Sequence, residues 1–209
     1  MSFDLWLAFV AASTALLLIP GPTVLLVLSY ALSQGRRVAV ASAIGVAFGD
    51  LLAMTASLVG LGALVLASAT LFTALKWIGA LYLVYLGVQL LRSNPTKGFK
   101  AEPSQNQIAA YQIFGHTFAV TALNPKSIAF FIAFVPQFLD STQPLGPQFI
   151  ILIATFVTLA AINVLAYALL ADRMRARVEK ASTLRNLNRM GGIALIGMGV
   201  LTASLNRAT

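Results

Sequence analysis

The sequence has no cysteine, one histidine and few charged residues, and these scarcities exclude several classes of function. Without cysteine there can be no disulfide framework, no thiolate metal site and no thiol redox chemistry. Six acidic residues and one histidine supply too few ligands for most metal sites. The sequence also lacks a nucleophile triad and a phosphate-binding glycine loop, so we expect neither an enzyme nor a bound cofactor or metal.

Hydrophobic residues dominate the composition. They make up 59% of the 209 residues, charged residues make up 10%, and the mean hydropathy is +0.87. Near-continuous apolar runs occupy residues 4–33, 38–67, 71–91, 111–139, 147–171 and 190–205. A spanning helix needs roughly 20 apolar residues, so the sequence predicts one all-α integral membrane domain, residues 1–209, with six transmembrane helices. The last run is short, and its helix either is near the lower length limit or begins within the preceding basic stretch.

Basic residues lie mainly in alternate predicted loops. Arg36 and Arg37 follow the first predicted helix, and the loop after the third contains Arg92, Lys97 and Lys100. The loop between the fifth and sixth helices carries the remaining members of this set, Arg173, Arg175, Arg177, Lys180, Arg185 and Arg189. Because Lys and Arg mark cytoplasmic loops, both termini are expected on the periplasmic side. The net charge of +8 is thus explained by topology and attraction to anionic lipid, and we expect no nucleic-acid binding.

Six helices with both ends on one side divide into two sets of three that cross the membrane in opposite directions. The sequence therefore predicts two inverted repeats, residues 1–92 and 109–209, joined by a polar cytoplasmic linker over residues 93–108. Each repeat carries a proline break near the middle of its first helix. Such a pair of breaks indicates a midplane binding site in secondary transporters.

The two breaks are Pro20-Gly21-Pro22 and Asn124-Pro125-Lys126. Proline donates no N–H, so carbonyl oxygens one turn earlier lose their helical partners. Thr23 and Asn124 are residue types that can cap the helix that restarts. Each restarting helix presents N–H groups suited to a carboxylate, and each preceding half ends in carbonyls suited to an ammonium or another cation. The alternative is a pair of proline kinks that only shape helix packing.

Two charged residues, Asp50 and Lys126, lie well inside the predicted hydrocarbon. A charge there costs at least about 2.5–3.5 kcal/mol, so both should line a cavity or pair with each other. Asp50 could carry a coupling proton. The alternative is a structural Asp50–Lys126 ion pair with no part in transport.

Other polar or small residues in the predicted helices are weaker candidates. Gly45 and Gly49 form a small-residue pair that favours close packing of Asp50's helix on a neighbour, with dimerisation as the alternative. Three further residues share one face of the third predicted helix and either line the pathway or bond between helices: Tyr82, Tyr85 and Gln89. Asn163 is the remaining deep polar side chain and should also face the interior.

Four ordered motifs carry a family resemblance. They are Ile19-Pro20-Gly21-Pro22, the segment 45–50, the segment 76–87, and Leu123-Asn124-Pro125-Lys126 followed by Phe130-Phe131 and the segment 134–138. Together they resemble the LysE/RhtB family of amino-acid exporters over essentially the whole chain. The resemblance implies a small permease of the bacterial inner membrane whose partners are its substrate, protons and lipid. It does not fix the substrate, which among members includes homoserine and threonine, branched-chain, basic and sulfur-containing amino acids.

 The same resemblance implies proton-driven export and a homodimer.

The residues and the resemblance lead to one hypothesis. We expect a secondary active exporter of amino acids or close derivatives, such as homoserine, threonine or leucine, that works by proton antiport. The substrate-binding residues would be those of the two breaks together with Asp50, namely Pro20, Gly21, Pro22, Thr23, Asn124, Pro125 and Lys126. Lys126 and the restarting helices would hold the carboxylate, and Asp50 with the freed carbonyls would hold the ammonium. The alternatives are a cation or metal exporter and a non-transporting membrane scaffold.

Overall fold

The computed structural model describes residues 1–93, 108–140, 142–178 and 181–204, and every regular element within them is helical. The predicted linker falls almost entirely outside these residues. The elements are α1 (Phe3–Leu18), α2 (Pro22–Gln34), the 3₁₀ turn η1 (Arg36–Val38), α3 (Ala39–Ala67), α4 (Ala69–Arg92), α5 (Ala110–Ala122), α6 (Pro125–Ala129), the π-helical η2 (Phe130–Phe134), the 3₁₀ turn η3 (Val135–Phe138), α7 (Leu145–Val178) and α8 (Ala181–Ser204).

Four helical stretches of the described chain are long and apolar enough to span a membrane. They are Arg36–Ala63, Thr73–Arg92, Ala110–Phe138 and Leu145–Ala171. The pair α1 and α2, bent by 55° at its break, makes a fifth when it is counted as one span. α8 is not among them, because its first turns carry arginine and asparagine. The predicted all-helical membrane architecture is therefore confirmed, whereas a sixth span and the inverted repeat stay predictions.

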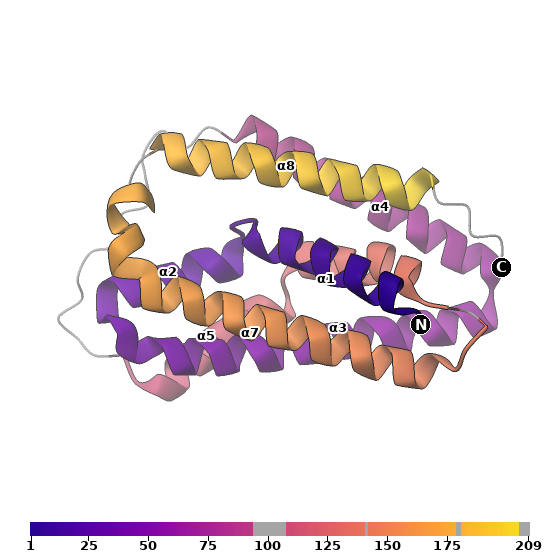
Figure 1. Ribbon diagram of the computed structural model, residues 1–209, viewed down its shortest axis with the longest axis horizontal. Helices are drawn as coiled ribbons and strands as arrows, with labels where there is room; N and C mark the ends of the chain where they lie inside the picture. Colours follow the sequence, from indigo (N-terminus) through magenta and orange to yellow (C-terminus); the bar gives the residue numbers. More distant parts are fainter. Residues whose placement is uncertain (94–107, 141, 179–180, 205–209) are drawn as a thin grey trace.

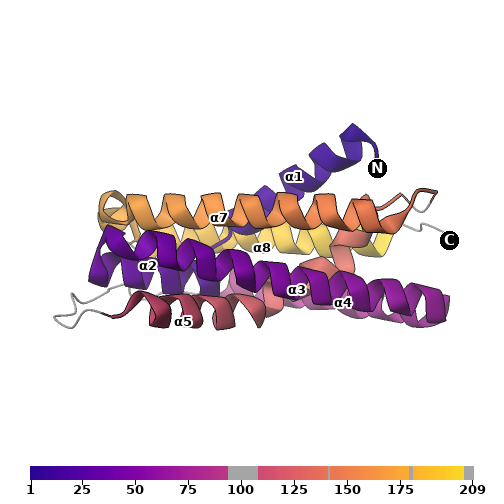
Figure 2. The ribbon, with the colours of Figure 1, turned by 90° about the horizontal axis from the view of Figure 1, so that it is seen from below.

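The helices are arranged around the bent pair. Figure 1 shows α4 and α8 lying together along one side and α3, α5 and α7 along the other, with α1 and α2 between them. Figure 2 shows α1 inclined away from the remaining helices while α2 continues among them. η1 and the start of α8 lie at the same end of the molecule, opposite the end at which α1 begins. The arginines of these two segments, Arg36, Arg37, Arg185 and Arg189, therefore share one end.

Both helix interruptions fall at prolines. α1 ends at Leu18 and α2 begins at Pro22, with Gly21 as an extended N-cap. α5 ends at Ala122, and α6 begins at Pro125. The Asn124 side chain caps α6 by accepting a hydrogen bond from the Lys126 N–H at 3.1 Å. Proline suits the first position of a helix, where its missing N–H would have no intrahelical acceptor.

Glycines bring α3 into contact with α5. A Cβ on Gly45 would lie 2.1 Å from Thr117 Oγ1, and one on Gly49 would lie 2.8 Å from the Phe118 carbonyl oxygen. Neither distance is possible for a real side chain, so the helices can be this close only at glycine. The predicted close packing of this face occurs within the chain, which leaves no room there for a second copy.

Glycines also join α4 to α8. A Cβ on Gly87 would lie 2.7 Å from the Gly192 carbonyl oxygen, and one on Gly199 would lie 2.7 Å from the Ala80 carbonyl oxygen. Buried phenylalanines hold α1 against η2, η3 and α7, with Phe9, Phe130, Phe131, Phe138 and Phe156 in a chain of ring contacts. The core around η2 is thus packed with aromatic rings, whereas the pairs α3–α5 and α4–α8 pack with their backbones in close contact at glycines.

Two segments differ from the sequence prediction. Residues 172–178, expected in a loop, continue α7 as helix, because alanine, methionine and arginine are strong helix formers and no proline or glycine interrupts them. The stretch after Pro125 was expected to be one regular helix but passes through η2 and η3. Pro136 explains the 3₁₀ turn, since it cannot donate the usual helical hydrogen bond.

Candidate functional site

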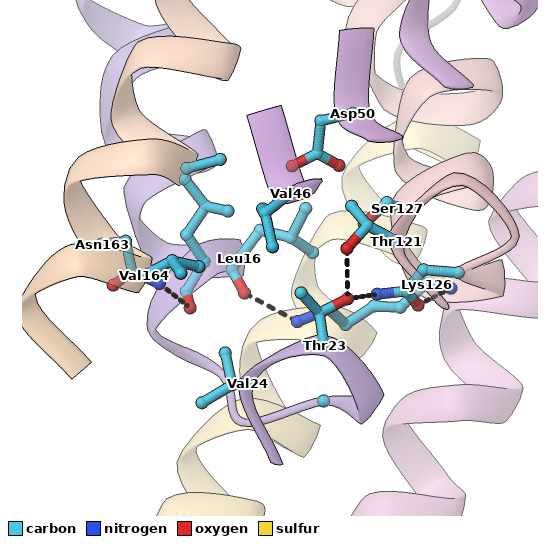
Figure 3. A pocket seen from close by; sticks show the side chains of 14 residues that line it. Leu16, Thr23, Val24, Val46, Asp50, Thr121, Lys126, Ser127, Asn163 and Val164 are labelled. Atoms are coloured by element: carbon cyan, nitrogen blue, oxygen red, sulfur yellow. Dashed lines mark hydrogen bonds between the residues drawn. The ribbon is translucent and has the colours of Figure 1, made fainter. Parts of the chain in front are cut away.

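The two helix interruptions meet inside the molecule. The Asn124 amide nitrogen donates to Thr23 Oγ1 at 3.2 Å, and Thr23 Oγ1 lies 3.3 Å from Thr121 Oγ1. All three side chains are buried. Figure 3 shows Thr23 and Thr121 of this cluster together with the Lys126 side chain, which extends toward Leu16 at the end of α1. Residues about 100 positions apart in the sequence therefore form one polar centre.

The Lys126 ammonium binds one carbonyl group in the last turn of α1 and one on Ile19, the residue that caps its end. Its Nζ donates to the carbonyl oxygens of Leu16 at 3.0 Å and Ile19 at 2.8 Å. The Leu16 oxygen also accepts the Ile19 N–H at 3.2 Å. A helix C-terminus carries partial negative charge, so these carbonyls form a cation site, and the protein's own lysine occupies it.

Two side chains of α7 bind the carbonyl groups of Leu17 and Leu18, which lie between Leu16 and Ile19 in the sequence. Asn163 donates its amide N–H to the Leu17 oxygen at 3.1 Å, and the Tyr167 hydroxyl donates to the Leu18 oxygen at 3.4 Å. A backbone group without a partner costs several kcal/mol in a membrane interior. The end of α1 thus keeps its four successive carbonyls paired by side chains from two other elements.

Asp50 lies beside this centre without contacting the lysine directly. Its side chain is 2% exposed, and within the described residues its Oδ1 has no hydrogen-bond partner. It lines a cavity of about 20 Å³ together with Lys126, Thr121 and Asn163. A cavity of this size holds about one water molecule. The Lys126 ammonium is bound to carbonyls instead, so the expected alternative of a direct Asp50–Lys126 ion pair is not what the structure shows.

A larger cavity lies on the other side of Lys126. It has a volume of about 490 Å³ and lies between the α1–α2 break, α4 and α8. Gly21, Asn124 and Lys126 line both cavities. Ser93 and Asn188 line the large cavity as well, and the Asn188 amide nitrogen donates to Ser93 Oγ at 2.8 Å. We call this large cavity the vestibule.

The remaining predicted residues occupy different places. Pro20, Pro22, Pro125 and Gln89 line the vestibule. Asn163 lines the small cavity. Tyr82 and Tyr85 contact each other with ring centroids 5.9 Å apart, and neither lines the small cavity or the vestibule. Tyr85 is exposed and borders a shallow surface pocket instead.

Sequence reasoning missed Tyr167 and Thr121. Tyr167 follows Asn163 by four positions, so both lie on the same face of α7, and this spacing could have indicated the pair. Thr121 precedes the second break by one turn, but nothing in the sequence distinguishes it from other helical threonines. Within the described residues, no group of three His, Asp or Glu side chains could hold a metal ion.

A match to a family model shows which family the chain belongs to. A family model described as a LysE type translocator matches residues 14–205. The chain belongs to this family. The resemblance seen in the sequence motifs is therefore confirmed, and the protein is a multi-pass membrane protein of a family of transporters.

Similar curated proteins cover nearly the whole chain. A homoserine/homoserine lactone efflux protein of Salmonella typhimurium is 34% identical over 208 residues, which is 100% of both chains. A leucine efflux protein of Enterobacter sp. (strain 638) is 30% identical over 95% of this chain and 94% of its own. An uncharacterized membrane protein of Vibrio cholerae is 33% identical over 98% of both chains. No solved structure matches.

Proposed function

We propose that the protein is a secondary active exporter of amino acids or close derivatives that works by proton antiport. The family and the two efflux relatives support amino-acid export, with homoserine, its lactone and leucine as first candidate substrates. One observation carries the mechanism: a helix end that binds an ammonium lies beside a buried carboxylate with an unpaired oxygen.

The ammonium and the carboxylate of an amino-acid substrate match the two helix ends at the first break. The ammonium would take the carbonyl oxygens of Leu16 and Ile19, which already bind an ammonium. The carboxylate would take the N–H groups at the start of α2, where Gly21 supplies no side-chain cap. Lys126 can join the carboxylate, as the sequence suggests, only after its amine leaves the carbonyls.

Asp50 would carry the coupling proton. A buried carboxylate without hydrogen-bond donors is favoured in its neutral, protonated form. A substrate ammonium adds a second positive charge to that of Lys126, which lines the same cavity as Asp50, and so favours the charged form. Binding of substrate and binding of the proton would therefore oppose each other. This opposition is what antiport requires.

The vestibule would admit substrate from the cytoplasm. It is lined by Ser93 and Asn188, which lie close to the ends of α4 and α8 that join the basic segments. The positive-inside rule places such segments in the cytoplasm and both termini in the periplasm of a bacterial inner membrane. α8 would be the sixth span, since its glycines pack along the span formed by α4. With six spans, the two halves would form the inverted repeat, and a homodimer is expected from the family resemblance.

The experiment is an efflux assay in cells loaded with a panel of dipeptides. We expect selective release of one group of amino acids in cells that contain the protein. Asp50→Asn should abolish this release while the protein remains in the membrane. Asp4→Asn is the matched control, because Asp4 is exposed in the first turn of α1 and should not affect transport. Release of no panel member by the wild type would refute the proposed function, and undiminished release by Asp50→Asn would refute the role of Asp50.

A further inference from the structure

The Lys126 ammonium occupies the place that the substrate ammonium would need. It binds the Ile19 carbonyl, for which the structure describes no other donor, and shares the Leu16 carbonyl with a backbone N–H. A substrate cannot bind both oxygens while the lysine does. The lysine and the substrate ammonium are therefore competitors for one site.

The surroundings of the amine are shaped to admit it. A Cβ on Gly21 would lie 3.3 Å from Lys126 Nζ and 3.4 Å from its Cε, so a larger residue at this position would crowd the lysine. On its other side Lys126 borders the vestibule of about 490 Å³, which gives the amine space to withdraw. The site thus allows two positions of the amine, one on the carbonyls and one in the vestibule.

We propose that Lys126 is a built-in substitute for the substrate ammonium, which keeps the α1 carbonyls paired while the exporter returns without cargo. This proposal rests on the proposed function. Substrate displaces the amine into the vestibule, crosses, and leaves; the amine then binds the carbonyls again. Without the Lys126 amine, the empty protein would have to change conformation with the Ile19 carbonyl unpaired inside the membrane, which is costly. The site accordingly selects compounds with a protonated amine, and a free carboxylate is secondary.

The proposal separates two transport modes. Net efflux requires the empty return, whereas exchange of substrate for substrate keeps an ammonium on the carbonyls in both directions. Lys126→Met should therefore lose net efflux and retain exchange. We expect net efflux to fall about a hundredfold, which corresponds to about 2.7 kcal/mol at 1.36 kcal/mol per tenfold change in rate.

The experiment uses proteoliposomes that contain the full chain, loaded with labelled L-homoserine or, if the efflux panel selects it, L-leucine. An uncoupler is present, and release is measured with and without unlabelled amino acid outside. Lys76 lies in α4 but does not line the vestibule, so Lys76→Met is the matched control and should preserve both modes. Homoserine lactone or leucinamide, which have an amine but no carboxylate, should also exchange through Lys126→Met.

Chemical rescue provides a second test. The chain has no cysteine, so Lys126→Cys introduces a single thiol facing the vestibule. Its thiolate displaces bromide from 2-bromoethylamine, forming a C–S bond and a side chain that ends in an ammonium at nearly the length of lysine. We expect this treatment to restore net efflux. 2-Bromoethanol adds a group of the same length without charge and should not restore it.

The outcomes are distinct. Loss of net efflux with exchange retained, and recovery only with the amine reagent, supports the proposal. Equal loss of both modes in correctly folded variants, or loss confined to substrates with a carboxylate, overturns it in favour of a carboxylate-binding lysine. Retention of both modes also overturns it. A wild type that transports none of the amino acids would instead refute the proposed function.

Discussion

Replacement of Gly49 by alanine tests whether close packing of α3 on α5 positions the site. The new Cβ would lie 2.8 Å from the Phe118 carbonyl oxygen and 2.8 Å from Thr121 Cβ. Both distances are shorter than real Cβ contacts, and the atoms belong to the backbone and a short side chain, so α5 must move. Thr121 would then lose its contact with Thr23 at 3.3 Å.

The matched control is Gly60→Ala in the same helix. A Cβ on Gly60 would meet no atom within 4 Å. Alanine at either position gains about 0.5–1 kcal/mol of helix stability relative to glycine, and this gain cancels in the comparison. The remaining difference is the cost of overpacking at Gly49, about 1–3 kcal/mol.

The assay is thermal unfolding of the purified variants, followed by tryptophan fluorescence. A difference of about 2 kcal/mol corresponds to roughly 4–8 °C for a chain of this length, with Gly49→Ala melting below Gly60→Ala. Efflux should fall in Gly49→Ala only. Equal melting temperatures and equal efflux would show that the α3–α5 contact does not determine the position of Asp50, and the packing argument would be wrong.

Three further substitutions test individual contacts. Gly21→Ala should reduce net efflux several-fold with little change in melting temperature, because its Cβ crowds the Lys126 amine; efflux assays and melting curves together check this. Thr23→Val removes a buried hydroxyl and should cost about 1–3 kcal/mol in unfolding measurements, with recovery in Thr23→Ser. Asn163→Leu leaves the Leu17 carbonyl without its amide donor and should lower both the melting temperature and efflux.

Much of the fold follows from sequence patterns with a local physical cause. Long apolar runs predict spanning helices, and prolines predict where α1 and α5 end, because both effects depend on neighbouring residues alone. The glycine pair before Asp50 likewise predicted close helix packing, which α5 provides. Helix limits were less accurate: α7 runs to Val178, since charged residues can continue a helix beyond the apolar run.

The arrangement of the site depends on contacts between distant segments and could not be derived from the sequence. The sequence predicts that Lys126 binds the substrate carboxylate. In the structure its amine instead binds carbonyl groups at the end of α1, more than 100 residues away. The sequence indicates that these carbonyls need donors, not which side chains supply them. The role of Tyr167 was missed for the same reason.

The measurement that tests the central claim most directly is proton movement during substrate release. Liposomes that contain the protein, a trapped pH-sensitive dye and L-homoserine or L-leucine start at equal pH on both sides, with the membrane potential clamped. Antiport predicts that the interior becomes acidic as the amino acid leaves, that Asp4→Asn behaves like the wild type, and that Asp50→Asn shows no acidification. Release of the amino acid by the wild type without a change in internal pH, or equal acidification in Asp50→Asn, would contradict the account.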